Sequence, residues 1–169
     1  MKKPALIFII VFSVSWAFES SFYLGAGRMS VLKEDKEYSY YGLNGEARFS
    51  FSLIPSCLIY LFEEIDAGFS LYTGGECIFG FLEFPFITKV VMQPEEFYIG
   101  WGAGFSFIYP ISSASCFKNN YFDFVMKLEG GYLYKKKRYL SGYLKLTADL
   151  NRGLPTERVI IGIGISSFR

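Results

Sequence analysis

The amino-acid sequence predicts an all-β protein, a single eight-stranded antiparallel up-and-down barrel that crosses a membrane after a signal peptide has been removed. Three observations lead to this fold class. The chain begins with an export signal, its aromatic content of 20% is high for a soluble domain, and long segments alternate large apolar residues with small or polar ones. Because successive side chains of a strand point to opposite faces, such alternation indicates strands with a different environment on each side.

The first 17 residues have the features of a secretory signal peptide. Lys2 and Lys3 precede a short apolar run over residues 5–14, and Ser15-Trp16-Ala17 places small residues at the cleavage positions. The alternative is an uncleaved anchor, but about ten strongly apolar residues fall short of the roughly 20 that a spanning helix needs. We therefore expect residues 1–17 to be removed and residues 18–169 to form one barrel domain.

Four segments with strand character come before residue 97. They span residues 22–32, 38–51, 58–72 and 77–92. Turn chemistry separates them, namely the charged stretch 33–37, Pro55 and Gly74-Gly75. Pro85 lies in the middle of the fourth segment. Because proline has no N–H to donate to a strand ladder, we expect a β-bulge or a break in register there.

The fifth segment, 97–109, has the clearest pattern. Its odd positions carry Phe97, Ile99, Trp101, Ala103, Phe105, Phe107 and Tyr109, and its even positions are mostly small. A tilted strand that crosses a bilayer needs roughly 9–11 residues, with apolar side chains toward lipid and aromatic ones at the interfaces. The length and the aromatic face of this segment favour a membrane strand.

Three more segments complete the predicted barrel. They span residues 121–134, 139–150 and 158–168. The connection 110–120 is the longest loop, and Lys135-Lys136-Lys137-Arg138 forms a turn that is either simply solvated or in contact with anionic head groups. An even number of strands with hairpin spacing favours closure into one barrel.

The same strands would also fit a soluble exported barrel of the lipocalin kind, with the two faces exchanged. In that case Gly100, Gly102 and Gly104 would face water, where charged residues are expected. The apolar faces of eight strands would also overfill the interior of so small a barrel. We therefore expect the apolar face to contact lipid. The residues assigned to it are Phe97, Ile99, Trp101, Phe105, Phe107, Phe122, Phe124, Leu144 and Leu146.

The polar face then encloses charges of both signs. These residues are Glu46, Arg48, Glu64, Asp66, Asp123, Lys127, Glu129, Lys145 and Asp149. Because buried charges persist only when they are paired and hydrogen-bonded, we expect an interior network of ion pairs with Arg48, Lys127 and Lys145 as its cations. The network is either a solid hydrogen-bonded plug or an ion path, and the narrow bore of eight strands favours the plug.

The chain resembles the small eight-stranded outer-membrane barrels of the OmpX type and the transmembrane domain of the OmpA type. The resemblance rests on the signal peptide, on the alternating segments 38–51, 97–109, 121–134 and 139–150, and on a terminal strand that reaches Phe168, although Arg169 follows it. It implies a monomer in the bacterial outer membrane, with the lipid bilayer and the outer-membrane assembly machinery as partners. With the N-terminus on the periplasmic side, the turns near Pro55, Pro94 and Lys136 lie there, and the slightly longer connections lie outside.

Composition excludes several kinds of chemistry. The chain has no histidine, so Ser/His and Cys/His nucleophiles and histidine metal sites are excluded, and we expect neither a cofactor nor an enzyme. Without residues 1–17 the chain has 15 basic and 16 acidic residues, a balance of −1 that does not suggest a nucleic-acid partner. Cys77 and Cys116 either form a disulfide, which leaves Cys57 unpaired, or all three are small apolar residues in or beside strands.

These observations indicate a structural or surface outer-membrane barrel with a polar interior filled by side chains. Its short outer loops are the parts available to ligands or host surfaces. Two alternatives remain at this point, a narrow pore and a soluble carrier of an apolar ligand.

Overall fold

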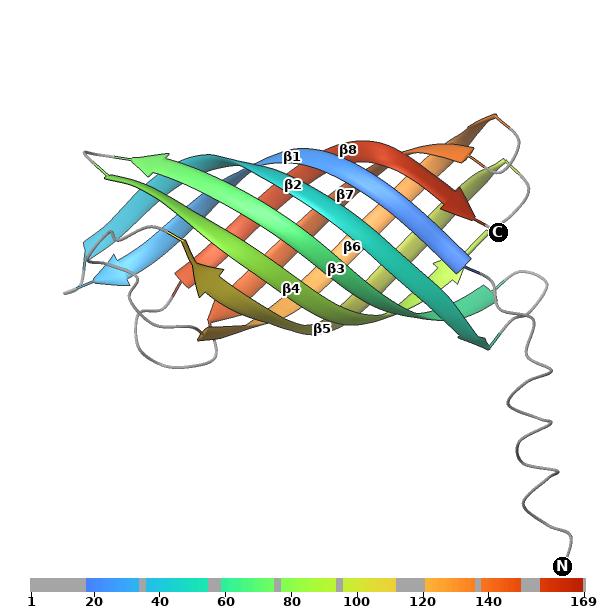
Figure 1. Ribbon diagram of the computed structural model, residues 1–169, viewed down its shortest axis with the longest axis horizontal. Coiled ribbons are helices and arrows are strands. Elements are labelled where there is room, and N and C mark those ends of the chain that lie inside the picture. The colour runs from blue at the N-terminus through green and yellow to red at the C-terminus, as the bar shows by residue number, and fades with distance from the viewer. Residues whose placement is uncertain are drawn as a thin grey trace, which may run out of the picture.

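The computed structural model describes residues 18–33, 36–54, 59–74, 77–93, 96–111, 121–135, 138–149 and 156–168. These residues form eight antiparallel strands: β1 (Phe18–Lys33), β2 (Lys36–Ile54), β3 (Ile59–Gly74), β4 (Cys77–Met92), β5 (Phe97–Pro110), β6 (Tyr121–Lys135), β7 (Arg138–Asp149) and β8 (Thr156–Phe168). Each strand pairs with its neighbours in sequence, and β8 pairs with β1 to close the barrel (Figure 1). The predicted all-β fold of eight strands is confirmed. Within the described ranges we find no helix long and apolar enough to cross a membrane.

The paired residues are staggered along the barrel axis from one strand to the next. A row of directly paired residues starts at Ser20 of β1 and returns to β1 at Ser30, ten residues farther along. This row passes through Phe49, Ile65, Phe86, Phe105, Phe124, Ala148 and Glu157. Such a stagger requires strands that tilt relative to the barrel axis, typically by about 35–45°. Figure 1 shows the tilt.

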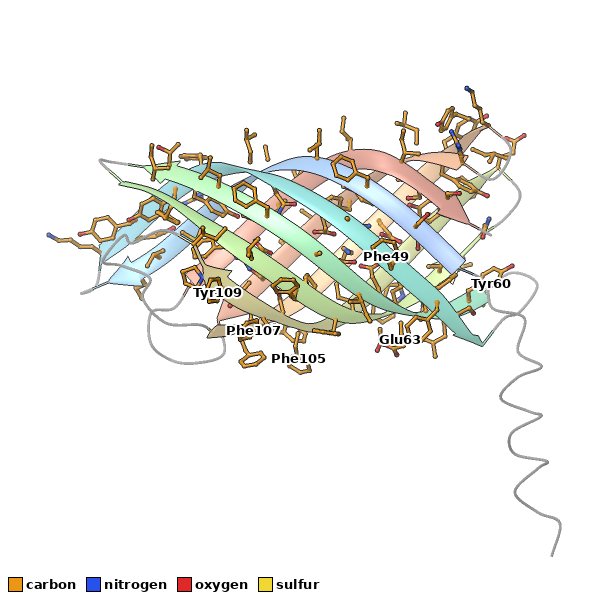
Figure 2. The ribbon with its side chains drawn as sticks, viewed as in Figure 1. Phe49, Tyr60, Glu63, Phe105, Phe107 and Tyr109 are labelled. Atoms are coloured by element: carbon orange, nitrogen blue, oxygen red, sulfur yellow. The ribbon has the colours of Figure 1, made fainter. Side chains whose placement is uncertain are left out.

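The alternation of residue types places one set of side chains outside and the other inside. In β5, Trp101 is 60% exposed, whereas its neighbours Gly100 and Gly102 are buried. Figure 2 shows Phe105, Phe107 and Tyr109 pointing away from the barrel. The outer face of the described strands is therefore mostly apolar, and the hydrophobic residues on it are exposed to the surroundings.

The interior has three layers along the barrel axis. We call the end where β1 begins and β8 ends the terminal end, and the opposite end the distal end. An apolar cluster of Phe62, Val91, Tyr98 and Tyr139, joined by Tyr60 and Leu133, fills the terminal end. A second cluster of Met29, Val31, Tyr72, Phe79, Phe81 and Ile108, joined by Tyr40, fills the distal end. The layer between them contains the charged residues.

Two expectations about the strands are wrong. β1 begins at Phe18 instead of residue 22, because Glu19 and Ser21 continue the inward-facing pattern and pair with both β2 and β8. Pro85 causes no bulge: it pairs with Ser106, and the register of β4 with β5 is constant.

The missing N–H of Pro85 has only a local effect. The pairing of β3 with β4 skips Asp66 and Ala67 and resumes in the same register at Gly68. The register shifts that do occur lie near strand ends, between Ser52 and Ile54 in β2 and between Leu133 and Lys135 in β6.

Two glycines on neighbouring strands test the assignment of inside and outside. Gly162 is buried, and a Cβ there would overlap the ring of its pairing partner Tyr143. Gly142 is on the outer face, where the nearest atom to an added Cβ would be the carbonyl oxygen of Gly162 at 3.6 Å. We expect Gly162→Ala to lower the free energy of unfolding by about 1–3 kcal/mol, because the filled interior has no room for the methyl group.

Gly142→Ala is the matched control and is expected to change this free energy by less than about 0.5 kcal/mol. Both values are measured by urea unfolding of the detergent-folded barrel. Equal effects of the two substitutions would contradict the assignment.

Candidate functional site

The middle layer contains twelve charged side chains, each only 0–3% exposed. They come from every strand except β5 because each occupies an inward-facing position of its strand. The seven acids are Glu19, Glu46, Glu64, Asp66, Glu83, Asp123 and Glu129, and the five cations are Arg48, Lys89, Lys127, Lys145 and Arg158. We call these twelve residues the interior network.

Lys89 connects its own strand, β4, to three others near the terminal end. Its Nζ atom lies 2.6 Å from Glu19 Oε2, 2.6 Å from Glu64 Oε2 and 2.8 Å from Glu129 Oε1. These three carboxylates converge as the ligands of a cation would. The ammonium group of Lys89 lies among them, so the chain itself supplies the positive charge at this position.

Arg48 and Lys127 form the centre of the network. Arg48 Nε donates to Glu46 Oε1 at 2.6 Å, and Arg48 Nη1 donates to Glu129 Oε2 at 2.6 Å. Lys127 contacts Glu64, Asp66 Oδ2 at 2.8 Å and Glu46 Oε1 at 3.1 Å.

Two tyrosine rings enclose the guanidinium of Arg48. Its central carbon lies 3.7 Å from the ring centroid of Tyr23 and 4.5 Å from that of Tyr143. Contact with aromatic faces stabilises a desolvated cation, since the ring quadrupole attracts positive charge.

Lys145 and Arg158 extend the network toward the distal end. Lys145 Nζ lies 2.6 Å from Glu46 Oε2 and 3.3 Å from Glu83 Oε2. Arg158 contacts Glu83, and its Nη2 atom lies 2.7 Å from Asp123 Oδ2. Arg158 Nε also donates to Thr147 Oγ1 at 2.9 Å. Glu46 and Glu83 are each shared by more than one cation, so the contacts form one continuous network.

The network is closed to solvent at both ends of the barrel. The aromatic cluster around Phe62 and Tyr98 covers the terminal side, and the cluster around Phe79 and Phe81 covers the distal side. The buried residues of these two clusters are at most 4% exposed. Charged groups in such an environment can hold the walls of the barrel together, but they are not accessible to a substrate in this structure.

Eight of the nine charged residues expected in the interior are buried in the network, namely Glu46, Arg48, Glu64, Asp66, Asp123, Lys127, Glu129 and Lys145. The side chain of Asp149 lies outside the described residues, as do those of Cys77 and Cys116.

Four network residues were missed from the sequence. Glu19 precedes the expected start of the first strand, and Arg158 stands at the expected first position of the last one. Glu83 and Lys89 lie on either side of Pro85, where the expected break in register prevented the alternation from being followed. Counting by two through the proline would have assigned both to the interior.

The candidate lipid-facing residues all lie on the outer face. Six of them are exposed: Phe97, Ile99, Trp101, Phe105, Phe122 and Leu146. Phe107, Phe124 and Leu144 are half-buried. For two of these, ring contacts with neighbours explain the lower exposure, since the ring centroids of Phe107 and Phe122 are 5.3 Å apart and those of Phe105 and Phe124 are 6.1 Å apart.

Comparison with known proteins finds similarity in structure. No family model matches the chain, and no curated protein matches its sequence. Neisserial surface protein A superimposes with a TM-score of 0.61 at 8% identity, over 89% of this chain and 97% of that one. Ail, the attachment invasion locus protein of Yersinia pestis, superimposes with a TM-score of 0.50 at 13% identity, over 88% of this chain and 97% of that one.

Both proteins are small eight-stranded outer-membrane barrels, and the resemblance expected from the sequence is confirmed. At these identities the likeness establishes the fold alone. The chain has the closed eight-stranded antiparallel barrel fold of small outer-membrane proteins.

Removal of one network cation tests how strongly the interior depends on its pairing. Lys89→Met leaves the carboxylates of Glu19, Glu64 and Glu129 without the ammonium group that they share. We expect the free energy of unfolding to fall by about 3–5 kcal/mol, because an uncompensated buried charge is far more costly than a lost surface pair. The measurement is urea unfolding in detergent micelles.

Lys36→Met, at an exposed position on β2, is the control and should change the free energy of unfolding by less than about 0.5 kcal/mol. Adding Glu19→Gln to Lys89→Met should recover part of the loss, since Lys89 is the cation that contacts Glu19, whereas Glu64 and Glu129 keep Lys127 and Arg48. A Lys89→Met barrel as stable as the Lys36→Met barrel would show that the network is not structurally important.

Proposed function

We propose that this protein is a structural barrel of the bacterial outer membrane, with its lipid-facing surface in the bilayer and its interior closed by the interior network. One observation carries the proposal: the described charges in the middle of the barrel are enclosed, while the surface around them is apolar. In a bilayer this arrangement satisfies both sets of side chains.

The interior argues against a soluble carrier of an apolar ligand. Such a carrier would need an apolar cavity and a hydrated exterior. Here the middle of the barrel contains twelve charged side chains, whereas Leu43, Ile78, Trp101 and Ile163 are each at least 60% exposed on the outside. In water this surface would form an apolar patch far larger than soluble monomers expose.

The interior also argues against the narrow pore. A conducting path needs groups that ions can reach from both ends, and the two apolar clusters lie between the network and the solvent. The five cations are all engaged by carboxylates, so an ion entering the barrel would have to displace them.

Catalysis has no support in the described part of the barrel. The chain contains no histidine, and the paired carboxylates of the network are buried beneath apolar clusters. We infer a structural role in the membrane. The distal end, where β1, β3, β5 and β7 finish, is the end that would meet ligands or host surfaces outside the cell.

Conductance in planar bilayers tests the closed interior. We expect purified barrel to insert without producing conductance steps, because both apolar clusters block the bore. A larger porin in the same bilayers controls for insertion and detection. Discrete steps that depend on the presence of this protein would favour the pore.

Behaviour in plain buffer tests the membrane placement itself. We expect the chain without residues 1–17 to stay folded only in detergent or lipid, with strand-type circular dichroism and a gel mobility that changes on boiling. The apolar outer surface has no partner in water, so aggregation is expected when detergent is removed. A folded monomer that remains soluble without detergent would contradict the proposal.

A further inference from the structure

A pair of exposed cations marks the terminal end of the β6–β7 hairpin. Lys135 and Arg138 are directly paired across the hairpin, and both side chains are exposed. In sequence they bound the run Lys-Lys-Lys-Arg at 135–138. Among the residues that the structure describes, and unlike the five cations of the interior network, neither forms an ion pair with a carboxylate. The backbone of Glu96 lies beside this hairpin, where its carbonyl oxygen accepts a hydrogen bond from Leu133 N at 2.7 Å.

Two tyrosines lie on the outer face beside this pair. Tyr132 is 60% exposed and Tyr134 is 43% exposed, at consecutive outward positions of β6. The Nζ atom of Lys135 lies 6.0 Å from the ring centroid of Tyr134. Tyrosine is typical of the head-group level of a membrane, where its ring contacts acyl chains and its hydroxyl stays hydrated.

Two glycines lie farther from the barrel end on the outer face of the same two strands. Gly130 of β6 and Gly142 of β7 are directly paired and belong to the outward-facing set. Their neighbours in the row are Ile99 of β5 and Ile163 of β8, both exposed. An added Cβ would meet only the carbonyl oxygen of Tyr98 at Gly130, at 3.4 Å, and only that of Gly162 at Gly142, at 3.6 Å. No side-chain atom therefore lies within 4 Å of either position.

The three features lie in the same order as the parts of a phospholipid, from the phosphate of its head group to its acyl chains. From the barrel end toward the middle they are a cationic pair, exposed tyrosines, and two glycines between the large apolar side chains of Ile99 and Ile163. We propose that this side of the β6–β7 hairpin binds an anionic phospholipid, with its phosphate between Lys135 and Arg138 and an acyl chain over Gly130 and Gly142. This inference rests on the proposed membrane placement and adds a specific lipid partner to it.

Retention of lipid by the purified barrel tests the site. The protein is folded in mixed vesicles of phosphatidylcholine with phosphatidylglycerol, extracted in mild detergent, and examined by native mass spectrometry for the lipid that remains bound. We expect phosphatidylglycerol to be retained in preference to phosphatidylcholine. Because each cation near a membrane surface contributes about 1 kcal/mol of attraction, the preference should fall roughly 25-fold in Lys135→Gln/Arg138→Gln.

Arg28→Gln/Lys36→Gln is the matched control, since it removes two exposed cations from the outer surface near the distal end. We expect it to keep the wild-type preference. Gly142→Leu places a large side chain where the acyl chain is proposed to lie, and should reduce lipid retention with both cations intact. The change in gel mobility on boiling verifies that each variant is folded.

The outcomes separate this inference from the membrane placement. Equal retention of the two lipids by wild-type protein, or an unchanged preference in Lys135→Gln/Arg138→Gln, would overturn the lipid site while leaving the barrel in the membrane. Failure of the wild-type protein to fold in any vesicle would instead contradict the membrane placement.

Discussion

The pairing of β8 with β1 is the constraint on which the rest of the structure depends. An open sheet presents unpaired N–H and C=O groups at its edges, which is prohibitively costly in a hydrocarbon layer. Closure pairs both edges and leaves every strand with one face inside the barrel and one outside. Only one assignment of the two faces then fits. The apolar side chains must lie outside because the enclosed volume is too small for them, and the charged side chains must lie inside because the surroundings of the barrel are apolar.

Closure also explains why the interior network connects strands that are not neighbours. Arg48 of β2 reaches Glu129 of β6, and Lys89 of β4 reaches Glu19 of β1, so these contacts cross the bore. Burying such pairs gives little net stability compared with an apolar core, since desolvation offsets most of the attraction. Each pair matters because its charges are already enclosed. Removal of one partner would leave the other as an uncompensated buried charge, which lowers the stability of the barrel. The apolar clusters at the two ends complete the arrangement by keeping water away from the pairs.

Much of the fold could be predicted from the sequence because a period of two is a local property. Residues 97–110 show it along most of their length, and the outward assignment of Trp101 and Phe105 needed no knowledge of the neighbouring strands. The missed residues lie where the local pattern is weak. Glu83 and Lys89 flank a proline, and Glu19 precedes the first large apolar alternation. The partners of each charge could not be predicted, because which carboxylates surround Lys89 depends on the stagger of four strands around the barrel.

Trp101 offers the most direct test of the account, since it is the one tryptophan of residues 18–169 and it is exposed on the outer face of β5. The measurement is fluorescence quenching of the folded protein in vesicles, with bromine on the acyl chains of the lipid in one sample and aqueous acrylamide in the other. The account predicts strong quenching by the brominated chains and weak quenching by acrylamide. The opposite result would mean that the indole faces water, and that the assignment of lipid and interior faces is reversed.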